Sequence, residues 1–140
     1  MEVHNIINII ITNFTLTNNR LQCNLTASAF NLGQASLNLT NISATEVRGI
    51  GLITNLSFLD LRNNQLTYFN PSISLPITLT NLYLNTNLIN TAGYTTSETW
   101  ANLQNSFTNL CTIRFTGNTN SVNGTNLKTI LEAKNAFVIY

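Results

Sequence analysis

A repeated spacing of leucines constrains the fold of this chain more than any other feature of its sequence. Residues 56–66 read Leu-Ser-Phe-Leu-Asp-Leu-Arg-Asn-Asn-Gln-Leu, which fills every position of the pattern L-x-x-L-x-L-x-x-N-x-L. Residues 79–89 repeat the pattern 23 residues later, and residues 11–21 match it upstream with Ile and Phe replacing two leucines. Recurrence at a fixed period predicts an architecture of similar units that stack on one another.

Weaker copies extend the same frame along the chain. Around Leu37-Asn-Leu39, Gln34 replaces the first leucine and Ile42 replaces the asparagine, which predicts a locally different turn. Residues 110–118 match as far as Asn118, and residues 137–140 supply the strand of a truncated last unit. The units therefore begin near residues 11, 34, 56, 79, 110 and 134, and they fill residues 1–140 as a single domain.

Each unit has a short segment in which apolar and polar residues alternate. Alternation with a period of two predicts a short strand whose leucines point into the core. The strands should stack in parallel, because each unit can bury its apolar face only against the next. The asparagines that end four of these strands should turn inward and bond the free backbone groups of the turn. They are Asn19, Asn64, Asn87 and Asn118.

This repeat resembles that of the leucine-rich repeat family, in a small bacterial or phage-type form. The resemblance implies an α/β fold, the curved leucine-rich-repeat solenoid, with about six short parallel strands on its concave face. Loops and one or two short helices should form the convex side. The connector that contains Pro71 and Pro76 resembles the extended connectors of bacterial members. The resemblance also implies that the concave surface contacts partners.

Two segments have helical spacing. Thr95-Thr-Ser-Glu98 fits a capping box ahead of Trp100, Leu103 and Phe107, which predicts a helix with these apolar residues packed in the core. A second short helix is expected over residues 126–134, with Leu127, Ile130 and Leu131 facing inward.

The chain has few residues that could perform catalysis. It contains one histidine, His4, and two cysteines, and no nucleotide-binding or hydrolase motif. We therefore expect no enzyme activity, no cofactor and no metal. Cys23 and Cys111 fall four strands apart, or about 19 Å. A disulfide needs Cα atoms within about 7 Å, so both cysteines should be free.

The net charge of +1 gives no basic surface for nucleic acid, which we do not expect as a partner. The apolar run at residues 6–11 lacks a preceding basic segment, so no secretory signal is expected. A membrane span needs about 18 continuous apolar residues, and none occurs. The localisation is left open between the cytoplasm and a virus particle.

The outward strand positions form columns that cross the units. In the first two units they are small and polar, whereas units 3 to 6 add larger side chains that form a candidate partner-binding surface. These residues are Phe58, Asp60, Arg62, Tyr83, Arg114 and Tyr140. In this frame Val138 also faces outward, beside Arg114. An alternative interpretation is that the charged residues only pair with one another and that Phe58 stacks on Tyr83.

Two functions remain at this stage. One is a non-enzymatic interaction module that binds a protein or surface glycan through the concave face. The other is a structural component of a larger assembly, such as a phage decoration, spike or tail protein, with end-to-end contact through the apolar strand at residues 136–140. The chain contains 25 Asn and 21 Thr but only 8% charged residues. This composition resembles that of proteins encoded by low-GC microbial or phage genomes. A surface of amides and hydroxyls should bind with weak salt dependence.

Overall fold

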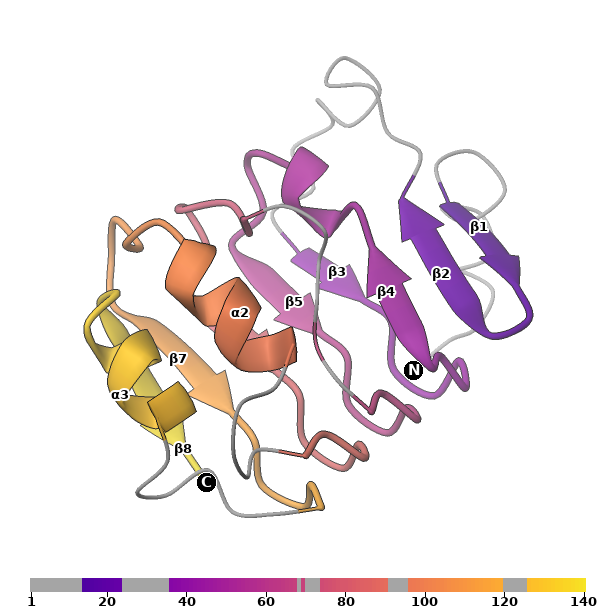
Figure 1. Cartoon of the computed structure of the whole chain (residues 1–140). Coiled ribbons are helices and arrows are strands. Elements are labelled where there is room, and N and C mark those ends of the chain that lie inside the picture. The colour runs from indigo at the N-terminus through magenta and orange to yellow at the C-terminus, as the bar shows by residue number, and fades with distance from the viewer. Residues whose placement is uncertain (1–13, 24–35, 68, 70–73, 91–95, 120–125) are drawn as a thin grey trace.

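The computed structural model describes residues 14–23, 36–67, 69, 74–90, 96–119 and 126–140. These residues form two β-sheets, two α-helices and the short 3-10 helix η1 (Ile50–Leu52), so the chain is an α/β protein (Figure 1).

The larger sheet has five strands, and every neighbouring pair in it is parallel. Its order is β3 (Ser36–Asn38), β5 (Phe58–Asp60), β6 (Asn81–Tyr83), β7 (Cys111–Arg114) and β8 (Ala136–Ile139). One buried side chain from each strand lies in a single row across the sheet, namely Leu37, Leu59, Leu82, Ile113 and Val138. The predicted parallel sheet is therefore confirmed for these five strands.

The first copy of the repeat folds differently from its prediction. Residues 14–23 form an antiparallel hairpin of β1 (Phe14–Thr17) and β2 (Arg20–Cys23), and β4 (Glu46–Arg48) pairs with β2 in parallel. Asn18 and Asn19 both have positive φ angles, of 50° and 63°, as a two-residue hairpin turn requires. The prediction that residues 11–21 add a strand to the parallel sheet is wrong, because this turn sends the chain directly back.

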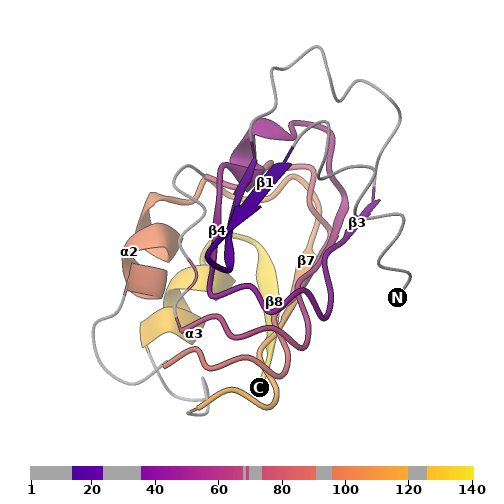
Figure 2. The same ribbon diagram turned by 90° about the vertical axis from the view of Figure 1, so that its right-hand side faces the viewer.

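The two sheets lie in different layers. In Figure 2 the parallel sheet lies on one side of the core, and β4 lies on the other side together with α2 (Thr96–Leu103) and α3 (Asn126–Glu132). Leu21 of β2 and Val47 of β4 are buried and belong to the same apolar cluster as the leucines of the parallel sheet. One core therefore joins both sheets and both helices.

The helices occur where their spacing predicts them. Leu127 and Leu131 of α3 are fully buried and Ile130 is partly buried. Trp100 of α2 is buried and packs edge-on against Phe69, with 4.9 Å between ring centroids.

One apolar residue of α2 is placed differently from its prediction. Leu103 is 72% exposed, so its predicted core packing is wrong. The inward position belongs to the next residue, Gln104, whose buried amide bonds the backbone N–H and carbonyl of Leu75. The amide oxygen of Gln104 also accepts the indole N–H of Trp100. Two other predictions, the capping residue Thr95 and the arm around Pro71, lie outside the described residues.

Candidate functional site

Three asparagines form one repeated set of hydrogen bonds along the edge where the parallel strands end. Each donates its side-chain amide to the carbonyl three residues earlier and to the corresponding carbonyl of the preceding strand. Asn64 bonds Leu61 and Leu39, Asn87 bonds Leu84 and Leu61, and Asn118 bonds Phe115 and Leu84. We call Asn64, Asn87 and Asn118 the asparagine series.

The side-chain oxygens of the same residues accept backbone N–H groups from the preceding turn. The oxygen of Asn64 accepts from Ile42 and Ala44 at 3.1 and 3.0 Å, that of Asn87 from Leu66, and that of Asn118 from Ile89. Each of these amides therefore uses both its donor and its acceptor to tie two successive turns together.

Asn19 is not part of this series, and its predicted inward position is wrong. It is exposed in the turn between β1 and β2, where its backbone carbonyl accepts the N–H of Thr45. The turn around Ile42 differs from the others, as the missing asparagine predicts, because Ser43, the residue after Ile42, also has a positive φ angle.

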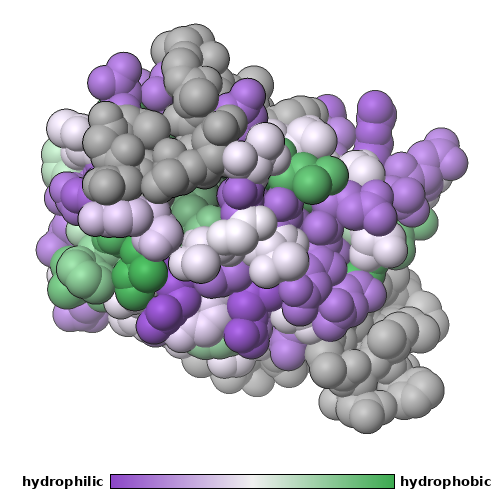
Figure 3. Space-filling view, turned by 90° about the horizontal axis from the view of Figure 1, so that it is seen from below, coloured by the Kyte–Doolittle hydropathy of each residue, from purple (hydrophilic) through white to green (hydrophobic). Residues whose placement is uncertain are grey.

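A second set of turn residues precedes the asparagine series. Asn41, Asn63, Thr86 and Gly117 hold corresponding places in successive turns, and all four have positive φ. Asparagine and glycine adopt this conformation more readily than other residues do. The turns after β5 and β7 lie at the lower edge of Figure 1, and the view from below in Figure 3 shows hydrophilic side chains across the middle of that face.

The outer face of the parallel sheet carries a cluster of large side chains around Tyr83. The strand register sets Asp60, Tyr83 and Arg114 side by side on β5, β6 and β7. The ring of Phe58 meets that of Tyr83 edge-on, with 5.1 Å between centroids and 73° between planes. The guanidinium carbons of Arg62 and Arg114 each lie 5.2 Å from the centroid of the Tyr83 ring. We call Phe58, Asp60, Arg62, Tyr83 and Arg114 the Tyr83 cluster.

Asp60 holds Arg62 in place and is itself buried, with 1% of its surface exposed. Its two carboxylate oxygens accept hydrogen bonds from the Arg62 side chain, with Nη2 at 2.6 Å from Oδ2 and Nε at 2.9 Å from Oδ1. The pKa of the Arg62 guanidinium is raised by these hydrogen bonds, because they favour its charged form. Asp60 therefore positions Arg62 and is itself closed to solvent.

Tyr140, the sixth residue of the predicted surface, lies apart from the Tyr83 cluster. Its ring is 6.0 Å from Nζ of Lys128 on α3. The register of β8 is shifted by one residue from the predicted frame, so Phe137 lies beside Thr112 and Ile139 beside Arg114. The outward position predicted for Val138 is therefore wrong, and this residue is buried.

The shifted register adds an aromatic residue that the sequence analysis missed. Phe137 is 54% exposed and follows Phe58, Asn81 and Thr112 in the same row of strand positions. Residues 136–139 are all apolar, so no alternation of polar residues could reveal which of them face outward.

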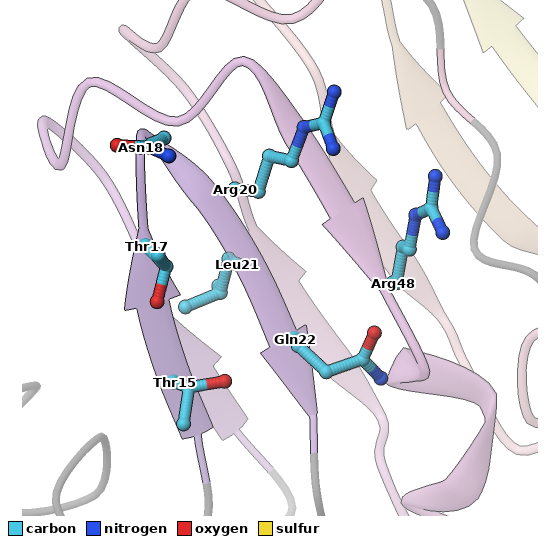
Figure 4. Close-up of a pocket in the computed structure, with 7 residues that line it drawn as sticks. All are labelled: Thr15, Thr17, Asn18, Arg20, Leu21, Gln22 and Arg48. Atoms are coloured by element: carbon cyan, nitrogen blue, oxygen red, sulfur yellow. The ribbon is translucent and has the colours of Figure 1, made fainter.

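A second polar surface lies on the sheet of β1, β2 and β4. A hollow of about 280 Å³ is lined there by Thr15, Thr17, Asn18, Arg20, Leu21, Gln22 and Arg48 (Figure 4). Glu46 is buried and forms ion pairs with both Arg20 and Arg48. The sequence analysis missed this surface because it assigned residues 11–21 to the parallel sheet.

Comparison of the chain with protein-family models, with curated proteins and with solved structures finds no match. The resemblance to leucine-rich repeats therefore depends on the residues of the chain itself.

The potential metal-ligating side chains of the described residues are dispersed. No three His, Cys, Asp or Glu side chains come together in the part of the chain that the structure describes, and His4 lies outside it. Cys23 and Cys111 are buried and neither forms a disulfide within the described residues, and burial raises the pKa of the Cys111 thiol to about 12. The Cys111 thiol is therefore neutral at ordinary pH. Neither described helix is long and apolar enough to cross a membrane.

Proposed function

We propose that this chain is a leucine-rich-repeat solenoid that acts as a non-catalytic interaction module. It binds a protein partner through the outer face of the five-stranded sheet, with the Tyr83 cluster at the centre. The repeated bonds of the asparagine series support the repeat architecture, because each one links a strand end to the turn before it.

The single observation that carries the binding proposal is the packing around Tyr83. This residue lies on β6, the third of five strands, with two guanidinium groups and the edge of Phe58 against its ring. Aromatic and arginine side chains dominate the binding energy of many interfaces. Side chains that already hold one another in position lose less conformational entropy when a partner binds.

A second candidate function is that of an assembly subunit. Within the described residues β8 pairs only with β7, and its Phe137 is largely exposed. An apolar edge strand of this kind favours pairing with another chain. If this function is the correct one, the purified protein should be oligomeric by light scattering, and Phe137→Asn should yield a monomer.

The test of the binding proposal is site-specific photocrosslinking in an extract of the source organism. A crosslinking amino acid replaces Asn81, which lies between Phe58 and Thr112 on the outer face. The matched control replaces Leu103, which is exposed on α2 in the opposite layer. We expect a discrete product from position 81 that disappears with Tyr83→Ala. Equal products from both positions, or no effect of Tyr83→Ala, would refute the proposal.

A further inference from the structure

Arg114 differs from the other three arginines of the chain because it has no carboxylate partner among the described residues. Arg20 and Arg48 pair with Glu46, and Arg62 pairs with Asp60. Arg114 is half-buried, and its guanidinium contacts the face of Tyr83. Fully buried cationic side chains are ordinarily paired with an anion, and further burial of Arg114 beneath a partner would favour such a pair.

The charges of the Tyr83 cluster do not cancel. Asp60 offsets the charge of Arg62, so the remaining positive charge of the cluster belongs to Arg114. The guanidinium is planar and carries five N–H donors, and its central carbon lies over the Tyr83 ring, 5.2 Å from the ring centroid. Its edge is then the natural site for an oxyanion, which a guanidinium binds through two parallel hydrogen bonds.

The surroundings of Arg114 favour a carboxylate over a phosphate. Phosphate-binding sites gather several cationic groups, whereas one of the two guanidiniums here is already neutralised by Asp60. Apolar side chains lie on both sides of Arg114 in the sheet, with Tyr83 on β6 and Ile139 on β8. The complementary group is therefore a single negative charge with apolar neighbours.

We propose that Arg114 receives the carboxylate of an aspartate or glutamate on the protein partner. The partner segment should then combine one central acidic residue with flanking apolar residues, which pack on Phe58, Tyr83 and Phe137. This inference rests on the proposed function of the same surface, and it adds the chemistry of the partner.

The test is a selection from a random peptide display library on the whole protein. Enriched peptides are synthesised, and their Kd values are measured by fluorescence polarisation against the wild type, Arg114→Gln and Tyr83→Ala. Arg20→Gln is the matched control, because it removes an exposed arginine from the other sheet while Glu46 retains its ion pair with Arg48. We expect the enriched peptides to contain an Asp or Glu. Their Kd should increase about tenfold or more for Arg114→Gln and should not change for Arg20→Gln.

A double-mutant cycle identifies the contact itself. Replacing the acidic residue of the peptide by its amide should weaken binding to the wild type about as much as Arg114→Gln does, and should cause no further loss in that variant. The peptide substitution also tests the contact if Arg114→Gln fails to fold, because it is measured on the wild-type protein. A peptide whose amide form binds the wild type equally well contradicts the inference.

The outcomes separate the inference from the proposed function. One outcome overturns the inference and leaves the proposed function standing. In it, the enriched peptides contain no acidic residue, bind Arg114→Gln as tightly as the wild type, and do not bind Tyr83→Ala. If the peptides bind both variants as tightly as the wild type, or if no peptide is enriched, both the inference and the proposed function are contradicted. Free acetate and free phosphate are added as competitors. Displacement by phosphate at a lower concentration than by acetate would overturn the preference for a carboxylate.

Discussion

Asn64 forms more side-chain hydrogen bonds than the other two residues of the asparagine series, so its replacement should cost the most stability. Replacing it by alanine removes an acceptor from the N–H groups of Ile42 and Ala44 and a donor from the carbonyls of Leu39 and Leu61. The carbonyl of Leu61 keeps the bond from Asn87, so three backbone groups are left without a replacement, namely the N–H groups of Ile42 and Ala44 and the carbonyl of Leu39.

The cost follows from the burial of these groups. Leu39 and Ala44 are fully buried and Ile42 is partly buried, so water does not easily replace the lost amide. A buried backbone group that is left without a partner costs about 1–3 kcal/mol. The three groups together predict a loss on the order of 4 kcal/mol, which is a large part of the about 5–15 kcal/mol that stabilises a typical domain.

The measurement is urea denaturation of Asn64→Ala beside a control from the same kind of turn. Asn85 is half-buried, and its side-chain oxygen has no hydrogen-bond partner, so Asn85→Ala should change the free energy of unfolding by less than about 0.5 kcal/mol. For a slope of about 2 kcal/mol per molar urea, Asn64→Ala should lower the midpoint by about 2 M. The reasoning is refuted if the two variants are equally stable.

Three further predictions concern a turn, a thiol and the binding surface. Gly49 has φ of 75° and lies where an added Cβ would be 2.7 Å from the backbone oxygen of Cys23, so Gly49→Ala should destabilise the fold by about 2 kcal/mol or more in the same urea assay. Above pH 9 the unfolded chain releases the Cys111 proton while the folded chain keeps it, so the free energy of unfolding should fall by up to about 1.4 kcal/mol per pH unit relative to Cys111→Ala. Equal slopes for the two proteins would contradict the burial effect. Because only Arg114 carries an unpaired charge in the Tyr83 cluster, partner binding should weaken less than about tenfold between 50 and 500 mM salt in fluorescence polarisation, and a steeper loss would indicate additional charge pairs.

The sequence predicts the parallel sheet well because its signal is local and redundant. Leu59 and Leu82 recur at a fixed spacing, alternate with polar residues and precede an asparagine, so three independent features agree on one register. The helices are predictable for a similar reason, since the apolar spacing of Leu127, Ile130 and Leu131 fits a helix and not the alternation of a strand.

The pattern fails at residues 11–21 because it does not distinguish a strand end from a hairpin turn. Asn19 fits the asparagine position of the repeat, and Asn18 and Asn19 together also fit a two-residue hairpin turn, where both residues need positive φ. The decision depends on tertiary pairing, because Thr45 then bonds the carbonyl of Asn19 and directs β4 against β2. The repeat pattern at residues 11–21 contains no signal for the contact with Thr45, which lies outside the pattern.

The binding surface could be predicted only in part. Five of its six residues are brought together, because β5, β6 and β7 follow the repeat. Sequence alone does not reveal that Asp60 is buried beneath Arg62, since that depends on the side-chain geometry within the turn. The sixth residue, Tyr140, was misplaced because the apolar residues 136–139 allow two registers.

The abundance of asparagine also has a structural explanation with two different requirements. In the asparagine series the side chain must supply a donor and an acceptor on one planar group, which aspartate and threonine do not reproduce in a buried site. In the residue before it, only a positive φ is required, and Asn63, Thr86 and Gly117 all satisfy it. Replacing the second residue should therefore cost less stability than replacing the first, because it leaves the bonds that join successive strands in place.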